Sequence, residues 1–235
     1  MSTGLAIFVK TPGLSPIKTR LAAAIGRLRA EQFHRLAAAC AAATAQAAGE
    51  TITPYWAVAE AEGLHDAQWL SLPRLAQGEG DLGVRMARVY DQLLARHGSV
   101  LLIGADIPQV QPVDLVQAAA AACVGNAPWV LGPTADGGFW LVGGRSPIPA
   151  AAWLDTPWSQ PDTAARFCDA LRPAPTRLAV LRDVDTYEDL RIMLAGLRTL
   201  SEPTTEQRTL LQSLHHWDNG GLKVRRTPDY NVDAI

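Results

Sequence analysis

Short apolar runs alternate along this chain with longer stretches that have helical periodicity. Buried strands are predicted at Leu5–Val9, Ile52–Ala59 and Val100–Ile103, because each is an apolar run of strand length. Two further apolar strands flank Pro133–Gly138, and the last strand is expected at Arg177–Leu181. Strands that alternate with helices predict an α/β fold.

Helical patterns fill the spaces between these runs. Helices are expected at Arg29–Ala48, Val84–Arg96, Val113–Cys123, Ala164–Leu171 and Thr204–Trp217. Another begins near Thr186, whose spacing to Asp189 matches a capping box. We see no internal repeat and no second domain, so we expect one domain over residues 1–200, followed by a C-terminal helix and tail over 201–235.

The stretch Ser99–Pro108 combines a strand with a candidate ligand. Gly104 ends the apolar run, and Asp106 follows just beyond the expected carboxyl end of the strand. Open α/β sheets bind ligands at that end of their strands. Asp106 has no basic neighbour in the sequence, so it is a candidate metal or phosphate-side ligand. The alternative is that Asp106 only caps a turn before Pro108.

The loop after the first strand is basic and rich in proline. Lys10, Lys18 and Arg20 lie within it, and Ile17 onward can start a helix. Basic side chains with the free amides of a helix start form a phosphate cradle. The glycine spacing matches neither a P-loop nor a dinucleotide fingerprint. The alternative is that these three cations simply lie on a solvated surface, which fits the pattern equally well.

Two glycine-containing turns offer backbone that can approach a ligand closely. Gln77 and Gly80 lie in the first, where a flat base could stack on the backbone and Gln77 could bond its edge. An ordinary turn with Asp81 as the helix N-cap is the alternative. Asp136-Gly137 in the second is a strong hairpin signal, although the glycine that follows also suits a backbone close to substrate.

Asp183 and Asp185 follow the last expected strand at another carboxyl end. Two carboxylates so close together repel, so they need a cation or exposure to water. Spacing alone does not decide which of the two would bind an ion.

Composition excludes several classes of function. The chain has 235 residues, 48% of them hydrophobic, and a net charge of -2, so nucleic acid and membrane surfaces are not expected as partners. Cys40, Cys123 and Cys168 are far apart and are expected to be core thiols. The first apolar run is too short for a signal peptide, and no segment is long enough to span a membrane, so we expect a cytoplasmic protein.

Four segments together carry a family resemblance: Lys10–Leu21, Gly104–Pro108, Gly132–Gly138 and Asp183–Leu190. Their order and content resemble an uncharacterised family of GT-A-type transferases, often labelled glycosyltransferases and related to 2-phospho-lactate guanylyltransferase and molybdenum-cofactor guanylyltransferase. The resemblance covers about residues 4–198. It implies a Rossmann-like GT-A nucleotide-diphospho-sugar transferase fold, with a mostly parallel seven-stranded sheet and helices on both faces. This chain has Ser15 where the family usually has glycine.

The resemblance also implies a role for each segment. Asp106 and Asp185 would hold Mg²⁺ or Mn²⁺, and Asp183 could replace Asp185. Lys10, Lys18 and Arg20 would neutralise the phosphates of the nucleotide. The residues implied for catalysis are Lys18, Arg20 and Asp106; those for the base are Gln77, Gly80 and Gly83; and those facing the acceptor are Asp136, Gly137 and Gly138.

Three functions remain open on this basis. The first is a metal-dependent nucleotidyltransferase that moves a nucleoside monophosphate from a triphosphate to a small phosphorylated acceptor and releases pyrophosphate. The second is a glycosyltransferase that uses a nucleotide-sugar, with Asp136 as a base. The third is a non-catalytic nucleotide-binding relative that forms a homo-oligomer through the tail around Gly220-Gly221.

Overall fold

The computed structural model describes residues 2–219, and their side chains as far as residue 214. A seven-stranded sheet forms its centre, in the order β3-β2-β1-β4-β6-β5-β7. The strands are β1 (Thr3–Val9), β2 (Ile52–Val58), β3 (Arg74–Ala76), β4 (Val100–Gly104), β5 (Trp129–Pro133), β6 (Phe139–Gly144) and β7 (Thr176–Arg177). β6 pairs antiparallel with β4 and β5, and the other pairs are parallel. The sheet confirms the predicted fold class.

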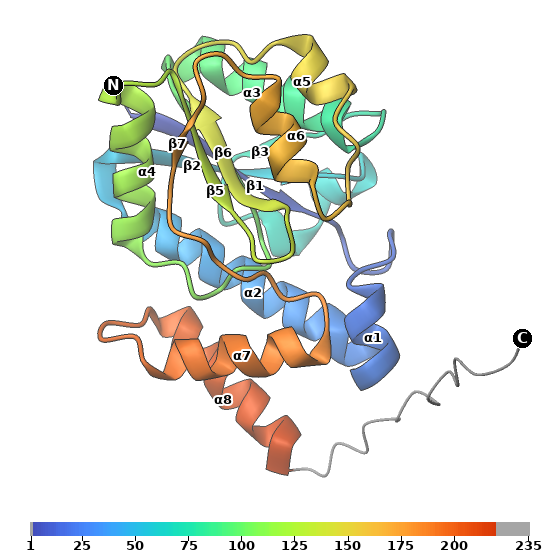
Figure 1. The fold of residues 1–235 in the computed structure, drawn as a ribbon. Helices are drawn as coiled ribbons and strands as arrows, with labels where there is room; N and C mark the ends of the chain where they lie inside the picture. The colour runs from blue at the N-terminus through green and yellow to red at the C-terminus, as the bar shows by residue number, and fades with distance from the viewer. Residues whose placement is uncertain (1, 220–235) are drawn as a thin grey trace, which may run out of the picture.

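Helices cover both faces of this sheet (Figure 1). They are α1 (Thr19–Ile25), α2 (Arg27–Ala47), α3 (Leu82–His97), α4 (Pro112–Val124), α5 (Ala150–Leu154), α6 (Thr163–Asp169), α7 (Tyr187–Arg198) and α8 (Thr205–Asn219). Short 3-10 helices lie at η1 (Gly49–Thr51), η2 (Glu62–His65) and η3 (Ala67–Trp69). Within residues 2–219 no helix combines the length and apolarity needed to cross a membrane.

Alternation along β1 divides the core between the two faces. Leu5 and Ile7 point into a cluster with α2 and α4, whereas Ala6 belongs to the opposite cluster with α3, α5 and α6. A third cluster joins α1, α2, α7 and α8, with Leu210 of α8 completely buried in it. Figure 1 shows α7 and α8 beside α2, away from α3 and α5. Helix α8 therefore packs directly on the helical layer that covers the sheet.

Several local expectations are confirmed. β5 and β6 form the predicted hairpin. Asp81 caps α3 by accepting a hydrogen bond from Val84 N, 2.9 Å away. Cys40 and Cys168 are buried, but Cys123 is only partly so, because it lies at the sheet end near the Ser99 hydroxyl.

The predicted strand at 177–181 is wrong in its length. Only Thr176 and Arg177 pair as β7, and a single bridge later joins Leu181 to Thr134. Between them the Ala179 carbonyl accepts a hydrogen bond from the Trp140 indole, so this edge segment leaves the regular ladder. Helix α5 was not predicted, because its five residues are too few to show a helical period.

Candidate active site

Three carboxylates meet at the carboxyl edge of the sheet. One oxygen each from Asp106, Asp183 and Asp185 lies within 4.8 Å of the others, and all three side chains are half-buried. Asp106 follows β4, whereas Asp183 and Asp185 precede α7. Val184 N donates a hydrogen bond to the Asp106 carbonyl over 3.2 Å, which joins the two segments directly. The structure therefore brings together acids that are nearly eighty residues apart in the chain.

Local sequence features position the two segments that carry this cluster. A Cβ on Gly104 would lie 2.6 Å from Asp106 Oδ1, so glycine leaves room for the carboxylate to fold back over the strand end. On the other side, Thr186 and Asp189 form the predicted capping box of α7. Val184 is completely buried between the two half-exposed acids. Burial of one residue and capping of the next helix thus fix Asp183 and Asp185.

Lys18 lies between two of the carboxylates. Its Nζ is 2.5 Å from Asp106 Oδ2 and 2.9 Å from Asp185 Oδ1, and its side chain is 9% exposed. Burial alone would lower the pKa of Lys18, but the two carboxylates outweigh this effect and raise it. Burial would likewise raise the pKa of Asp106, yet Lys18 holds it below the ordinary value. Lys18 is therefore a buried ammonium bound to an acidic site.

This contact corrects the expectation that Asp106 has no basic partner. Lys18 is 88 residues away in the sequence and reaches Asp106 from the start of α1. Its backbone has φ 46° and ψ 52°, in the left-handed region that residues with a side chain rarely adopt. Arg20 lies further out, with its NH1 3.6 Å from Asp185 Oδ2 and a side chain that is 72% exposed.

Asp183 has no ion pair among the described residues. Burial and the negative charges of Asp106 and Asp136 raise the pKa of Asp183 to about 6. The cluster thus carries more negative charge than Lys18 alone can balance. Carboxylate oxygens are the ligands that Mg²⁺ and Mn²⁺ prefer, so the donor set fits a divalent cation beside Lys18 or in its place.

The beginning of the basic loop is held by the adjoining elements. Thr11 N donates to Glu60 Oε2 over 2.8 Å, and the indole of Trp69 donates to Thr11 Oγ1. His34 Nε2 donates to the Lys10 carbonyl, and burial lowers the pKa of this histidine, which favours its neutral form. Lys10 itself is exposed at the strand end. Of the three predicted cations, Lys18 and Arg20 reach the acidic cluster.

The structure gives packing roles to two residues that the resemblance assigns to the base. The Gln77 side chain is buried, and its amide donates to the carbonyls of Val9 and Ala57. Gly83 is buried too, and a Cβ there would lie 2.1 Å from the Trp153 carbonyl oxygen. Gly80 remains exposed, with φ 112°. Their contact with a base stays a prediction.

Two arginines of α3 hold this turn, and the local sequence gave no sign of them. Arg88 NH1 donates to the carbonyls of Gln77 and Glu79, at 2.6 and 3.0 Å. Arg85 Nε donates to the Gly80 carbonyl over 2.7 Å. The turn from 77 to 80 is therefore fixed by the helix that follows it.

The hairpin between β5 and β6 lies next to the acidic cluster. Asp136 Oδ1 accepts hydrogen bonds from Thr134 Oγ1 and Gly138 N, at 2.5 and 3.1 Å. Thr134 bridges to Leu181, just before Asp183. Gly137 has φ 92°, and a Cβ there would lie 1.7 Å from the Pro161 carbonyl oxygen, so close packing requires this glycine. The hairpin thus forms one wall beside the carboxylates, and its role toward an acceptor stays a prediction.

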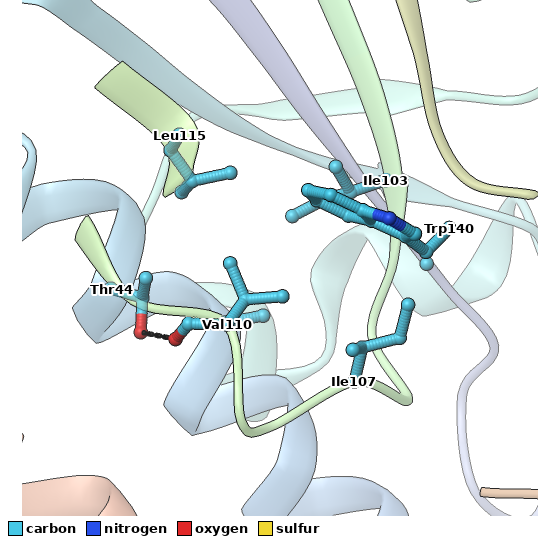
Figure 2. Close-up of a pocket in the computed structure, with 8 residues that line it drawn as sticks. Thr44, Ile103, Ile107, Val110, Leu115 and Trp140 are labelled. Carbon is cyan, nitrogen blue, oxygen red and sulfur yellow. Dashed lines mark hydrogen bonds between the residues drawn. The ribbon is translucent and has the colours of Figure 1, made fainter. Parts of the chain in front are cut away.

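A small apolar pocket lies behind the loop that carries Asp106 (Figure 2). Its walls are Ala41, Thr44, Ile103, Gly104, Ile107, Val110, Leu115 and Trp140. The Thr44 hydroxyl is already bonded to the Val110 carbonyl, and the Trp140 indole to that of Ala179. Bonded polar groups and apolar walls are typical of a packing void rather than of a substrate site.

Solved structures share this fold. A candidate nucleotide-diphospho-sugar transferase from Desulfovibrio desulfuricans G20 is 22% identical, with 94% of this chain and 98% of that chain covered and a TM-score of 0.79. CMP:2-keto-3-deoxy-manno-octonic acid synthetase complexed with CTP is 11% identical, with 85% and 100% covered and a TM-score of 0.54. 4-diphosphocytidyl-2C-methyl-D-erythritol synthase from Anaerococcus prevotii DSM 20548 is 12% identical, with 84% and 99% covered and a TM-score of 0.52.

No curated protein matches the chain in sequence. A family profile does match, over residues 31–160, and it spans more than half of the chain, including β4, Asp106 and the hairpin. This match and the shared fold confirm the resemblance that the four segments carry. The chain belongs to the family described as "Uncharacterized protein conserved in bacteria (DUF2064)".

Proposed function

We propose that this protein is a metal-dependent nucleotidyltransferase. It would transfer a nucleoside monophosphate from a nucleoside triphosphate to a small phosphorylated acceptor. The observation that carries the proposal is the cluster of Asp106, Asp183 and Asp185 around Lys18 at the carboxyl edge of the sheet. Acidic ligands with an adjacent buried cation are what binding of a triphosphate with a divalent ion requires.

The proposed reaction is an in-line displacement. An oxygen of the acceptor phosphate forms a bond to the α-phosphorus, the bond from that phosphorus to the α,β-bridging oxygen breaks, and pyrophosphate leaves with the electron pair. Such chemistry depends on positioning and charge stabilisation, so no nucleophilic side chain is needed. Lys18 and Arg20 would neutralise the phosphate oxygens. Mg²⁺ or Mn²⁺, held by the carboxylates, would supply further charge neutralisation.

The two substrates would lie on opposite sides of the cluster. Strands β1, β2 and β3 are parallel and end at the same edge, which places Lys10 and the turn around Gly80 on one side. The hairpin at Asp136 lies on the other side, next to Asp183. The nucleotide would occupy the first side and the acceptor the second. Ligand binding at the carboxyl ends of strands in open α/β sheets supports this arrangement.

A glycosyltransferase that uses a nucleotide-sugar is the second candidate. The observation in its favour is Asp136, an exposed carboxylate on the hairpin beside the cluster, where it could accept a proton from an acceptor hydroxyl. Its Oδ1 already accepts two hydrogen bonds from the hairpin itself, so this oxygen is not free to face an acceptor hydroxyl. We therefore favour nucleotidyl transfer.

Calorimetric titration tests the proposal. Each nucleoside triphosphate and common nucleotide-sugar is titrated with and without Mg²⁺, on the wild type, on Asp106→Asn and on the control Asp155→Asn, which removes an exposed charge outside the cluster. We expect one triphosphate to bind only with Mg²⁺, and Asp106→Asn to weaken that binding at least tenfold while Asp155→Asn does not.

Product analysis then separates the candidates. Release of pyrophosphate in the presence of a phosphorylated acceptor supports nucleotidyl transfer, and release of a nucleoside diphosphate from a nucleotide-sugar supports the second candidate. Nucleotide binding that is equal in the wild type and Asp106→Asn, without turnover, would contradict both and favour the non-catalytic relative.

A further inference from the structure

The loop from 105 to 111, which carries Asp106, is tied to a helix at the other end of the chain. The amide nitrogen of Gln207 in α8 donates to the carbonyls of Pro108 and Val110, at 2.8 and 3.1 Å. These contacts join residues 99 and 97 positions apart. The Gln207 side chain is buried, with the residue only 1% exposed. Both bonds lie within four residues of Asp106.

Every polar atom of the Gln207 amide is used. Its Oε1 accepts from Thr204 N over 2.8 Å, while Gln207 N donates to Thr204 Oγ1 over 3.2 Å, a capping box at the start of α8. The carbonyls of Pro108 and Val110 can only accept, so the amide nitrogen must face them. Leu210 and Leu214 then anchor the helix in the third core cluster. Gln207 is therefore held rigidly before it meets the loop.

Apolar packing behind the loop is incomplete. Ile107 and Val110 border the small apolar pocket of Figure 2, so their side chains lack packing partners on that side. The loop is held partly by the burial of Ile107 and Val110 and by the Lys18 ion pair to Asp106. Its backbone is held by polar contacts: Val184 N to the Asp106 carbonyl, Gln109 Nε2 to the Arg182 carbonyl, Thr44 to the Val110 carbonyl, and the two bonds from Gln207. The side-chain amide of Gln207 thus links α8 to the backbone of this loop. Its loss would leave the Pro108 carbonyl buried without that donor.

We propose that Gln207 is a positioning residue that holds the 105–111 loop, and with it the Asp106 carboxylate, in register with Asp183 and Asp185. The consequence for metal affinity rests on the proposed function, in which Asp106 is a metal ligand. Groups that orient a ligand through hydrogen bonds commonly change metal affinity by tenfold or more when they are removed. Helix α8 is then part of the site and not an appendage to it.

The test compares Gln207→Met with Leu210→Ala. Methionine keeps the approximate length of the side chain and loses the two bonds donated to the loop, together with the Oε1 that accepts from Thr204 N. Leu210→Ala removes buried packing of the same helix and leaves the bonds to the loop intact. Two quantities are measured well below the unfolding temperature: hydrogen exchange of the amides in 105–111, and the affinity for Mn²⁺ alone. Thermal unfolding shows how far each variant is destabilised.

We expect Gln207→Met to accelerate exchange in the loop and to weaken Mn²⁺ binding about tenfold. Leu210→Ala is expected to lower the unfolding temperature at least as much as Gln207→Met does. It should change neither the amide exchange of the loop nor the affinity for Mn²⁺. Unchanged loop exchange in Gln207→Met, or equal acceleration in Leu210→Ala, would overturn the positioning role. Accelerated exchange in a protein whose wild type does not bind Mn²⁺ would support that role and contradict the metal site of the proposed function.

Discussion

The turn at 77–80 and the acidic cluster lie at the same edge of the sheet, yet they are held in opposite ways. The carbonyls of the turn are bound by neighbours in sequence, since Arg88 is 11 residues from Gln77 and Arg85 is 5 from Gly80, while the Gln77 side chain anchors the turn to Val9 and Ala57. The cluster is fixed by distant ones, since Lys18 is 88 residues from Asp106 and 167 from Asp185. We infer that the turn, once Gln77 is anchored to the sheet, keeps its shape largely through local contacts, whereas the cluster exists only when the whole domain is folded.

This difference separates two properties of the proposed enzyme. Binding of the base would depend on a locally stabilised turn, and binding of the metal and phosphates on tertiary contacts. Substitutions in one region should therefore leave the function of the other largely unchanged. Three variants test that separation.

Lys18→Met is expected to have the largest effect. It leaves the half-buried carboxylates of Asp106 and Asp185 without their cation, which should cost about 3 kcal/mol of unfolding free energy. Turnover should fall at least 100-fold, because the phosphates lose a neutralising charge. Thermal unfolding with and without Mn²⁺ checks the physical cause, since a divalent cation should restore part of the lost stability.

Arg20→Gln is the matched control for Lys18→Met. Its ion pair to Asp185 spans 3.6 Å and the arginine is largely exposed, so the unfolding free energy should change by less than about 0.5 kcal/mol. Equal destabilisation by the two substitutions would show that burial of Lys18 between the carboxylates is not what stabilises the cluster.

Arg88→Met addresses the other region. Loss of the bonds to the Gln77 and Glu79 carbonyls should loosen the turn and weaken nucleotide binding about tenfold, or about 1.4 kcal/mol. Mn²⁺ affinity should not change. Titrations of nucleotide and of Mn²⁺ give the two values, with Arg96→Met near the end of the same helix as the control. A parallel loss of Mn²⁺ affinity would remove the distinction between the regions.

Asp183→Asn should have a smaller effect on stability than Lys18→Met, and of the opposite sign. The folded pKa of Asp183 is about 6, above the ordinary carboxyl value of the unfolded chain. Its contribution to stability is therefore fully present below the unfolded pKa and is lost as the pH rises through about 6. Without metal, the variant should be more stable than the wild type at pH 8, because it removes a negative charge that the neighbouring carboxylates repel. We expect a gain of only about 1 kcal/mol, because the side chain is half-buried and water screens the repulsion.

Unfolding curves in EDTA at pH 4 and pH 8 measure this effect, and the advantage of the variant should disappear at the lower pH. Mn²⁺ should stabilise the wild type more than the variant, because the variant has lost a carboxylate ligand. A variant that is less stable than the wild type at pH 8 without metal would contradict the account of repulsion in the cluster.

The sequence predicted the parts of the site that depend on short-range rules. The strand before Asp106, the N-cap at Asp81, the capping box at Thr186 and the hairpin at Asp136 are all confirmed, because each depends on residues a few positions apart. The predicted length of the last strand was wrong, because the Ala179 carbonyl accepts a hydrogen bond from the Trp140 indole and the segment leaves the sheet ladder.

Contacts between distant segments were beyond such rules. Nothing near Asp106 in the chain points to Lys18 or to Gln207, and Gln77 gave no sign that its amide would join two strands. The roles of Gly80 and Gly138 toward ligands are still predictions. The suggested assembly through Gly220-Gly221 lies outside the described residues.

The sequence alone determined the α/β alternation, the strand-end position of Asp106 and the family, because apolar periodicity and turn chemistry act over a few residues. Only the tertiary structure decided which acids meet, which cation lies between them and which helix braces their loop. The reason is physical: parallel strands that are far apart in the chain end at the same edge of the sheet. Charges brought together there change one another's pKa strongly, because partial burial reduces the screening by water.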